Sequence, residues 1–406
     1  MLTNARYNQV ANCTAAVVVL LMAVGAVFVF SASASVAGEL DIHKFYDYPA
    51  LRQIFFFPLA CMVLFAFAAL DYRNLRPDRG WLQSPTLYLL ILSIALLVIV
   101  LLPQIGIERN NARRWLRLTM GTFNISFQPS ELAKWMTVLF LSGFCAKYGD
   151  GIRSFRKRFV PACCVVGVVV GLIVVEDVGT AALISLLAFL MLIIAGAKWW
   201  HVLAPLPFGI LGFVYVLIHS PARLERIWAW IWPEKYPALS YQAGQSLTAL
   251  GSGGSFGKGL GGGMCKYGHL PEDTTDFIFA IIGEEMGFVG NAAVILLFIV
   301  FIWLGILIVV RCKDRFGQLL AGGIVMAIGI QAALNIGVVT VVLPTKGIPL
   351  PFVSAGGTSM LLSSAAVGIL LSIARQTAAK PAESKIQDQP AQAAINSETR
   401  RILIHA

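Results

Sequence analysis

Residues 277–310 read FIFAIIGEEMGFVGNAAVILLFIVFIWLGILIVV, a run in which only Glu284 and Glu285 are charged. A hydrocarbon layer about 30 Å thick needs roughly 20 apolar residues for one helical crossing, and this run exceeds that length. Comparable runs recur along the chain, which is 58% hydrophobic and only 13% charged. Lipid must therefore be the solvent of this protein, because a water-soluble core cannot bury so large an apolar fraction.

The sequence predicts an all-α polytopic membrane protein with about ten transmembrane helices. Residues 1–375 are expected to form one membrane domain, with a long extracytoplasmic loop (residues 221–276) between the seventh and eighth helices. Residues 376–406 contain a stretch rich in Ala, Gln, Pro and Lys and are predicted to be a disordered cytoplasmic tail. The predicted membrane segments are Ala15–Ala34, Gln53–Leu70, Leu87–Leu102, Leu132–Tyr148, Phe159–Val175, Gly179–Ala197, Trp200–Ile218, Phe277–Val310, Leu319–Leu343 and Thr358–Ala374.

The formal net charge of +10 does not indicate a nucleic-acid partner, because no soluble domain remains to carry a basic face. Short basic loops within residues 73–79, 153–158 and 311–315 instead predict, by the positive-inside rule, an inner-membrane protein with both termini in the cytoplasm. The rule leaves a second set of cations outside, which suggests an anionic, lipid-linked substrate at that face. This set includes Arg113, Arg114, Arg117, Arg223, Arg226, Lys258, Lys266 and Lys346.

The exterior segment 103–131 holds the first candidate residues. Arg113 and Arg114 are candidate substrate-binding residues, although an aromatic and basic belt at the membrane interface would also explain them. Pro129 suits the first turn of the following helix, which places Glu131, a candidate supporting carboxylate, and Lys134, a further candidate substrate-binding residue, one turn apart on one face.

The adjacent carboxylates Glu176 and Asp177 occupy a very short turn between the fifth and sixth helices. Such a pair at a membrane boundary is expensive unless it is solvated or paired, so we expect a cationic partner from Arg113, Arg114, Lys134 or Lys346. A structural salt bridge and a chemical role both remain open for this turn.

The glycine-rich run GSGGSFGKGLGGG (residues 251–263) is not a phosphate-binding P-loop, because the required glycine and the Ser or Thr after Gly-Lys are missing. Glycine here permits a close-packed loop, in which exposed backbone amides and Lys258 could approach an anion. The seven cysteines form no disulfide framework, and no His/Cys spacing suggests a metal site.

Asp276 lies where the long loop enters the eighth helix and is followed by Phe277, Ile278 and Phe279. A carboxylate against apolar neighbours has its charged form disfavoured, which suits a general base. A helix-capping role for Asp276 remains equally open from position alone. Further along, Glu284 should point at protein or water and not at lipid, and pairing between helices is expected for it or for Glu285.

Several motifs together resemble the SEDS family, the FtsW, RodA and SpoVE-like proteins of cell division and elongation. The resemblance spans nearly all the membrane region, and its fine pattern is closer to FtsW than to RodA. It rests on RRWLRL (113–118), FQPSELAK (127–134), EDVGTA (176–181), GKGLGGGMCKYGHLPEDTTDFIFAIIGEEMGFVG (257–290) and LPTKGIPLPFVSAGGTS (343–359).

This resemblance implies a peptidoglycan glycosyltransferase that polymerises lipid II into glycan strands during cell division and releases undecaprenyl pyrophosphate. It implies a class B penicillin-binding protein and other division proteins as partners. Asp276 matches the family's proposed catalytic Asp, and the blocks around Lys346 and Arg113 match other family segments. The chain departs from the family at Thr274, where His is common, and at Ala355, where Tyr is common.

The chemistry agrees with these residues. A diphosphate leaving group needs cations more than protonation, and one carboxylate can take the proton of the attacking hydroxyl. A divalent cation, Mg²⁺ or Mn²⁺, could assist. The alternative functions are a lipid II flippase or transporter and a non-catalytic scaffold of the division machinery. Transporters concentrate ionisable groups near the bilayer midplane, whereas these charges gather at the outer interface.

Overall fold

The computed structural model describes residues 4–33, 48–77, 80, 83–109, 112–120 and 123–377. Each of the predicted membrane segments coincides with a helix in this part of the chain, which confirms the polytopic helical fold class. Residues 378–406 of the predicted tail lie outside the described residues.

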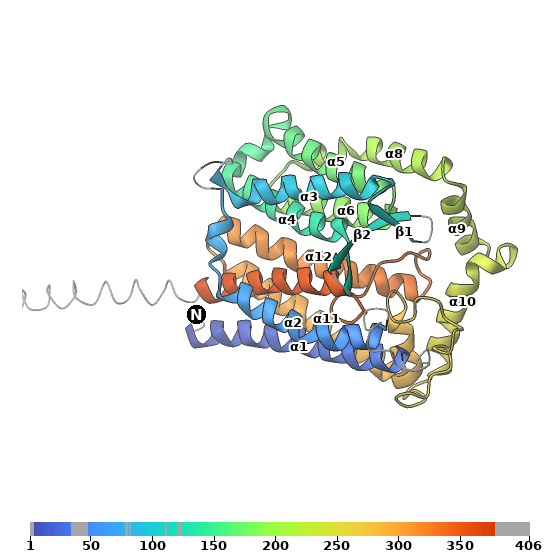
Figure 1. Ribbon diagram of the computed structural model, residues 1–406. Helices are drawn as coiled ribbons and strands as arrows, with labels where there is room; N and C mark the ends of the chain where they lie inside the picture. Colours follow the sequence, from blue (N-terminus) through green and yellow to red (C-terminus); the bar gives the residue numbers. More distant parts are fainter. Residues whose placement is uncertain are drawn as a thin grey trace, which may run out of the picture.

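The helices run back and forth side by side in one bundle (Figure 1). Five of them, α2, α3, α4, α9 and α10, begin at a proline, whose fixed φ suits the first helical turn. Their bounds are α1 Asn4–Ser33, α2 Pro49–Ala69, α3 Pro85–Leu101, α4 Pro129–Tyr148, α5 Val160–Val174, α6 Val178–Ile194, α7 Trp199–Leu203, α8 Leu206–Ile218, α9 Pro221–Ile231, α10 Pro237–Ser252, α11 Ile278–Arg311, α12 Arg315–Val339 and a last helix Gly357–Thr377. Short helical turns lie at η2 Tyr72–Leu75, η4 Gly149–Arg153, η5 Phe155–Phe159 and η6 Pro233–Lys235.

Among the described residues, seven helices are long and apolar enough to cross a membrane. The others in the bundle, α3, α4 and α6, are shorter or carry more charge. α4 and α12 lie at the centre of the bundle and bury most of their side chains. α8 buries none of its residues, and Phe208 and Leu211 are among its most exposed side chains, as expected for a surface that contacts lipid.

A small antiparallel sheet joins α3 to α4, which the sequence pattern did not predict. Its strands, β1 Gly106–Arg109, β2 Ala112–Met120 and β3 Phe123–Phe127, are paired in the order β1-β2-β3. Trp115 lies opposite Ile107, and Arg117 lies opposite Ser126. The sheet satisfies the backbone groups of a segment too polar for a membrane helix. We call the end of the bundle that carries it, together with α9 and α10, the sheet end (Figure 1).

The opposite end of the bundle gathers the basic connections (Figure 1). Arg76 donates to Asp314 at 2.9 Å, which ties η2 to the turn between α11 and α12. Arg315 donates to the carbonyl oxygen of Ala195 at the end of α6. The start of α1 at Asn4 and the end of the last helix at Thr377 also lie at this end (Figure 1).

The helix α11 is interrupted at Gly287, which has φ 66° and ψ −162°. The glycine-rich loop supplies the hydrogen bonds that the break removes. Backbone N–H groups of Lys258 and Gly259 donate to the carbonyls of Glu284 and Glu285, both at 3.0 Å. In return, the N–H groups of Phe288 and Val289 donate to carbonyls in residues 254–255 of the loop at 2.9 and 3.2 Å. A Cβ on Gly287 would lie 2.4 Å from the nitrogen of Gly257, so only glycine fits at 287.

Candidate active site

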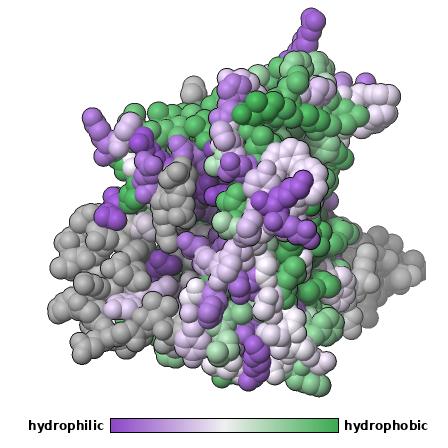
Figure 2. All heavy atoms as spheres, turned by 90° about the vertical axis from the view of Figure 1, so that its right-hand side faces the viewer, coloured by the Kyte–Doolittle hydropathy of each residue, from purple (hydrophilic) through white to green (hydrophobic). Residues whose placement is uncertain are grey.

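A cavity of about 770 Å³ opens at the sheet end. Its walls come from α2, β2, α4, α6, α9, α10, the segment before α11 and the loop 345–356. Six cations line it, namely Arg52, Arg114, Arg117, Lys134, Arg226 and Lys346, against the three carboxylates Glu131, Glu272 and Asp276. In the view onto the sheet end, hydrophilic residues gather in the middle of the face and hydrophobic residues border it (Figure 2). The excess of cations favours an anionic ligand.

Asp276 reaches the cavity from the segment before α11, where it is half-buried. The N-cap of α11 is Phe277, which makes no side-chain cap hydrogen bond, and Asp276 lies one residue before it. The backbone carbonyl of Asp276 accepts from Asn335 Nδ2 at 2.8 Å. Its carboxylate packs against Gly347, where an added Cβ would lie 3.0 Å from Asp276 Oδ2.

Two loops form the floor of the cavity together. The N–H of Ala355 donates to the carbonyl oxygen of Thr274 at 2.9 Å, and the Ser354 hydroxyl donates to the carbonyl of Thr275. Thr274 and Ala355, the two departures from the family pattern, therefore contact each other through their backbones. Because backbone atoms make this contact, neither side chain is needed for it.

Lys346 lies in the cavity wall beside a group of other cations. The pKa of its ammonium is lowered to about 8, chiefly by burial. The negative charge of Asp177 raises this pKa, while the positive charges of Arg223, Arg114 and Arg226 lower it further. Burial and Arg114 likewise lower the pKa of Arg223. Crowded cations of this kind gain from an anion that neutralises them together.

Arg114 and the turn between α5 and α6 hold the sheet against the bundle. Arg114 Nε and Nη2 donate to the carbonyl oxygen of Glu176 at 3.0 and 2.8 Å, and Arg114 Nη1 lies 3.8 Å from Asp177 Oδ2. The backbone N–H of Arg113 donates to Glu176 Oε2 at 2.9 Å, while its guanidinium pairs with Glu108 at 3.3 Å. The expected cationic partner of the Glu176–Asp177 turn is thus confirmed, and only Arg114 of the two arginines lines the cavity.

Lys134 is buried at the centre of a chain of polar contacts. Its Nζ donates to Glu131 Oε2 at 2.8 Å and to Gln331 Oε1 at 2.7 Å, so the two residues predicted to lie one turn apart on one face form an ion pair. Ser359 donates to the same Glu131 oxygen, and Gln331 Nε2 donates to the carbonyl oxygen of Pro349 at 2.9 Å. This chain ties α4, α12, the loop 345–356 and the last helix together beneath the cavity.

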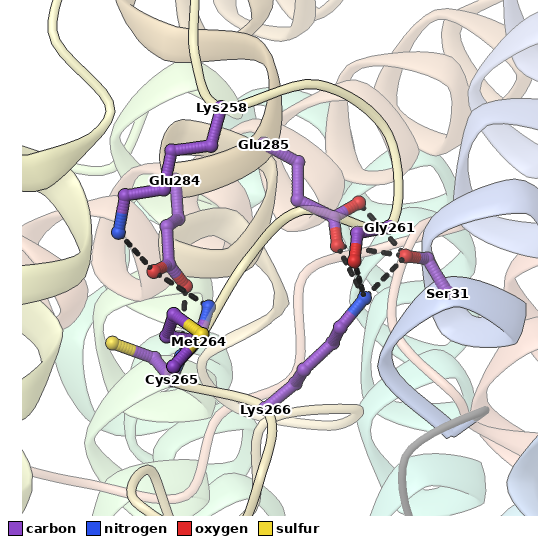
Figure 3. A network of polar contacts seen from close by, with 8 residues as sticks. All are labelled: Ser31, Lys258, Gly261, Met264, Cys265, Lys266, Glu284 and Glu285. Carbon is purple, nitrogen blue, oxygen red and sulfur yellow. Dashed lines mark hydrogen bonds and ion pairs between the residues drawn. The ribbon is translucent and has the colours of Figure 1, made fainter.

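Lys258 and Glu284 lie away from the cavity, in the network drawn in Figure 3. Lys258 Nζ donates to Glu284 Oε1 at 2.7 Å, and Glu284 also accepts from the backbone N–H groups of Met264 and Cys265. The expectation that Lys258 and free loop amides approach an anion is therefore wrong for residues 258 and 259, whose amides bond to α11.

Glu285 belongs to the second half of this network (Figure 3). Lys266 Nζ donates to Glu285 Oε1 at 2.9 Å, and the hydroxyl of Ser31 donates to the same carboxylate at 2.7 Å. Both Glu284 and Glu285 are fully buried, which confirms that they avoid lipid. The Ser31 bond is the expected contact between helices, and the ion partners of both carboxylates come from the loop.

Sequence reasoning missed three residues of this site. Arg52 lines the cavity from α2 and donates to the carbonyl oxygen of Ala355 at 3.2 Å. Gln331 and Asn335 lie one turn apart on α12, inside an apolar run that was predicted only as a membrane segment. Two buried amides at spacing i, i+4 in a membrane helix were the available signal, since such groups require partners.

The divalent cation that the sequence analysis allowed for would need oxygen ligands, chiefly carboxylates. Within the described ranges, no group of three or more His, Cys, Asp or Glu side chains could hold a metal ion.

The fold and sequence have known counterparts. Residues 11–379 match the FtsW/RodA/SpoVE family model, described as "Cell cycle protein". The chain is 39% identical over 363 residues to stage V sporulation protein E of Bacillus subtilis (strain 168), covering 88% of this chain and 95% of that protein. It is 38% identical over 360 residues to the probable peptidoglycan glycosyltransferase FtsW of Trichlorobacter lovleyi, covering 88% and 91%.

Two solved structures share the fold. The first was solved in work on the structural coordination of polymerization and crosslinking by a peptidoglycan synthase complex; its TM-score is 0.68 at 25% identity, covering 89% of this chain and 97% of that one. The second, the rod shape determining protein RodA of Thermus thermophilus, has a TM-score of 0.61 at 24% identity, covering 89% and 95%.

Proposed function

The chain belongs to the FtsW/RodA/SpoVE family of cell cycle proteins, and on that premise we propose that it is a peptidoglycan glycosyltransferase that polymerises lipid II. One observation carries the assignment of the site. A cavity large enough for sugar units brings the carboxylate of Asp276 together with several arginines and lysines at one end of a membrane bundle. That arrangement suits a lipid-anchored substrate whose reactive groups lie at the membrane surface.

In the proposed reaction, the 4-hydroxyl of one sugar attacks the anomeric carbon of the sugar carried by a second lipid. Asp276 takes the hydroxyl proton as the new glycosidic bond forms. The bond from the anomeric carbon to the diphosphate oxygen breaks, and undecaprenyl pyrophosphate leaves with the electron pair. Because this leaving group is a weak base, it needs charge neutralisation more than a proton.

The cations that neutralise the diphosphate are, in this proposal, Arg114 and Lys346, with Arg226 beside them. All three line the cavity, and their charges already act on one another. The ion pair between Lys134 and Glu131 supports the site by stabilising the packing beneath the cavity. Arg113, Lys258 and Glu284 are assigned to anchoring the sheet and the loop, because their contacts lie elsewhere.

Binding of lipid II is expected to weaken as the pH rises through about 8, the pKa of Lys346. The ammonium is charged below this value and neutral above it, so the charged fraction falls from roughly 0.9 at pH 7 to roughly 0.1 at pH 9. The Lys346→Arg variant keeps its charge and should lose this pH dependence. Binding of lipid II in nanodiscs between pH 7 and pH 9 measures both. An equally steep fall in the Arg variant would exclude Lys346 as the titrating group.

Gly347→Ala is expected to slow turnover on the order of tenfold while the protein stays folded. The new methyl carbon would press on the Asp276 carboxylate at 3.0 Å and displace it by a few tenths of an ångström. Small displacements of a catalytic group are costly in rate. The matched control is Gly244→Ala in α10, where an added Cβ meets no atom within 4 Å of the described structure. Unchanged turnover in both variants would count against the placement of Asp276.

We further propose that the chain lies in the bacterial inner membrane with both termini cytoplasmic and the sheet end outside. Its partner would be a class B penicillin-binding protein within the division machinery. The separation of the basic connections from the sheet end supports this orientation. A flippase is less favoured, since the cavity opens at one end of the bundle and not at its midplane.

The decisive experiment is polymer formation from lipid II by the purified chain, alone and with its cognate penicillin-binding protein. Glycan strands that form with native protein, and not with an active-site variant, would support the proposal. Transbilayer movement of lipid II without polymer would favour the flippase, and neither activity would favour a scaffold.

A further inference from the structure

Asn335 joins the two loops that form the cavity floor, although it does not line the cavity itself. It projects from α12 and is 1% exposed. Its Nδ2 donates to the carbonyl oxygen of Asp276 at 2.8 Å and to that of Ile348 at 2.7 Å. The backbone of the proposed base and the loop that carries Lys346 are thus held by one side chain on a helix at the centre of the bundle.

The orientation of the Asn335 amide follows from its surroundings. If its oxygen and nitrogen were exchanged, a carbonyl oxygen would lie against two other carbonyl oxygens at hydrogen-bond distance, which is repulsive. In the observed orientation both amide protons have acceptors. The residue at 335 must therefore donate two hydrogen bonds from one atom.

This arrangement has a cost in stability. Asn335 Oδ1 is buried and has no hydrogen-bond partner among the described residues. An unsatisfied buried acceptor is unfavourable and calls for an explanation, because an apolar side chain of similar shape would avoid it. The two donated bonds supply the explanation, because they link α12 both to the segment before α11 and to the loop 345–356.

We propose that Asn335 is a positioning residue for glycosyl transfer, which sets the spacing between Asp276 and the loop that bears Lys346. The inference rests on the proposed role of Asp276. Asn335 touches neither substrate nor reacting atoms. It acts by fixing two backbone segments to α12. The Asp276 carboxylate and the cations that bind the leaving group therefore keep a fixed distance from each other.

The test uses two substitutions of similar size in the full-length protein with its partner. Asn335→Leu removes both donors, and we expect kcat to fall about 10- to 100-fold while affinity for lipid II stays within about threefold. Asn335→Asp restores one donor only when its carboxyl is protonated, and burial favours that form. Its rate relative to native protein should therefore rise as the pH falls from 8 to 6.

Thr340→Val, at the C-cap of the same helix, is the matched control. It removes a hydroxyl that donates to the carbonyl of Ile336 in α12 at 2.8 Å, away from the cavity floor. Native kcat is expected in this variant, and melting temperatures of all three should be compared in the same detergent.

A native kcat in Asn335→Leu, or a relative rate of Asn335→Asp that does not change with pH, would overturn the proposal. Failure of both Asn335 variants to fold would overturn it as well, since Asn335 would then be a residue of stability. The parent proposal fails separately. If Asp276→Asn polymerises lipid II normally, the catalytic assignment is wrong; if Asp276→Asn is inactive and the Asn335 variants are normal, only the positioning role is wrong.

Discussion

Asp276→Asn is expected to reduce polymer formation from lipid II by about 10²–10⁴-fold, the usual loss when a positioned base is removed. Asparagine keeps the size of the side chain but lacks the basic oxygen. The backbone carbonyl at 276 keeps its bond from Asn335, and 276 is not the N-cap of α11, so the fold should survive. The measurement is glycan polymer at matched protein level and matched partner binding.

Asp273→Asn is the control for this experiment. Asp273 lies three residues upstream, burial raises its pKa to about 6, and it does not line the cavity. Near-native polymer formation is expected from this variant. Should the Asp276 variant also turn over normally, the base must be sought elsewhere. Glu131 and Glu272 would be tested first, because both line the cavity, and Glu176 and Asp177 next.

Glu285→Gln is expected to destabilise the protein by about 3–5 kcal/mol, the range found when one partner of a buried ion pair is removed. Lys266, whose side chain is 3% exposed, would lose its buried ion pair with Glu285. The loss should appear as a lower melting temperature and as faster proteolysis of the glycine-rich loop. Activity per folded molecule should fall less, because Glu285 lies outside the cavity wall.

The exposed pair between Arg113 and Glu108 provides the comparison, with side chains 32% and 55% exposed. Glu108→Gln should change stability by less than about 1 kcal/mol, since solvent screens such pairs. Equal losses in the Glu285 and Glu108 variants would mean that the network of Figure 3 does not hold the loop.

The membrane fold could be predicted because lipid imposes a simple rule, namely long apolar helices with charges kept to their ends. The same rule identified Glu131, Lys134 and Asp276, which are charges at places where charge is costly. The pairing of the Glu176–Asp177 turn with a cation followed from that cost. Each of these predictions needed only the type of a residue and its position in the sequence.

The remaining features depend on contacts between distant segments. Nothing local distinguishes Arg52, near the start of α2, from an ordinary interfacial arginine until the loop 345–356 lies against it. The sheet escaped prediction because β1 and β3 have only four and five residues, and pairing with β2 gives them stability that their own pattern does not indicate. Exposed amides were expected in the run 251–263, and the bonds of residues 258 and 259 could not be foreseen because the break in α11 at Gly287, which supplies their acceptors, lies about thirty residues away along the chain.

That break at Gly287 also constrains how the protein can be made. Four backbone groups around it bond to the loop, and none of them would find a partner in hydrocarbon. The loop precedes α11 in the chain, so it is synthesised before the helix groups that bond to it. The loop and α11 must therefore come together before the region around the break can lie in hydrocarbon.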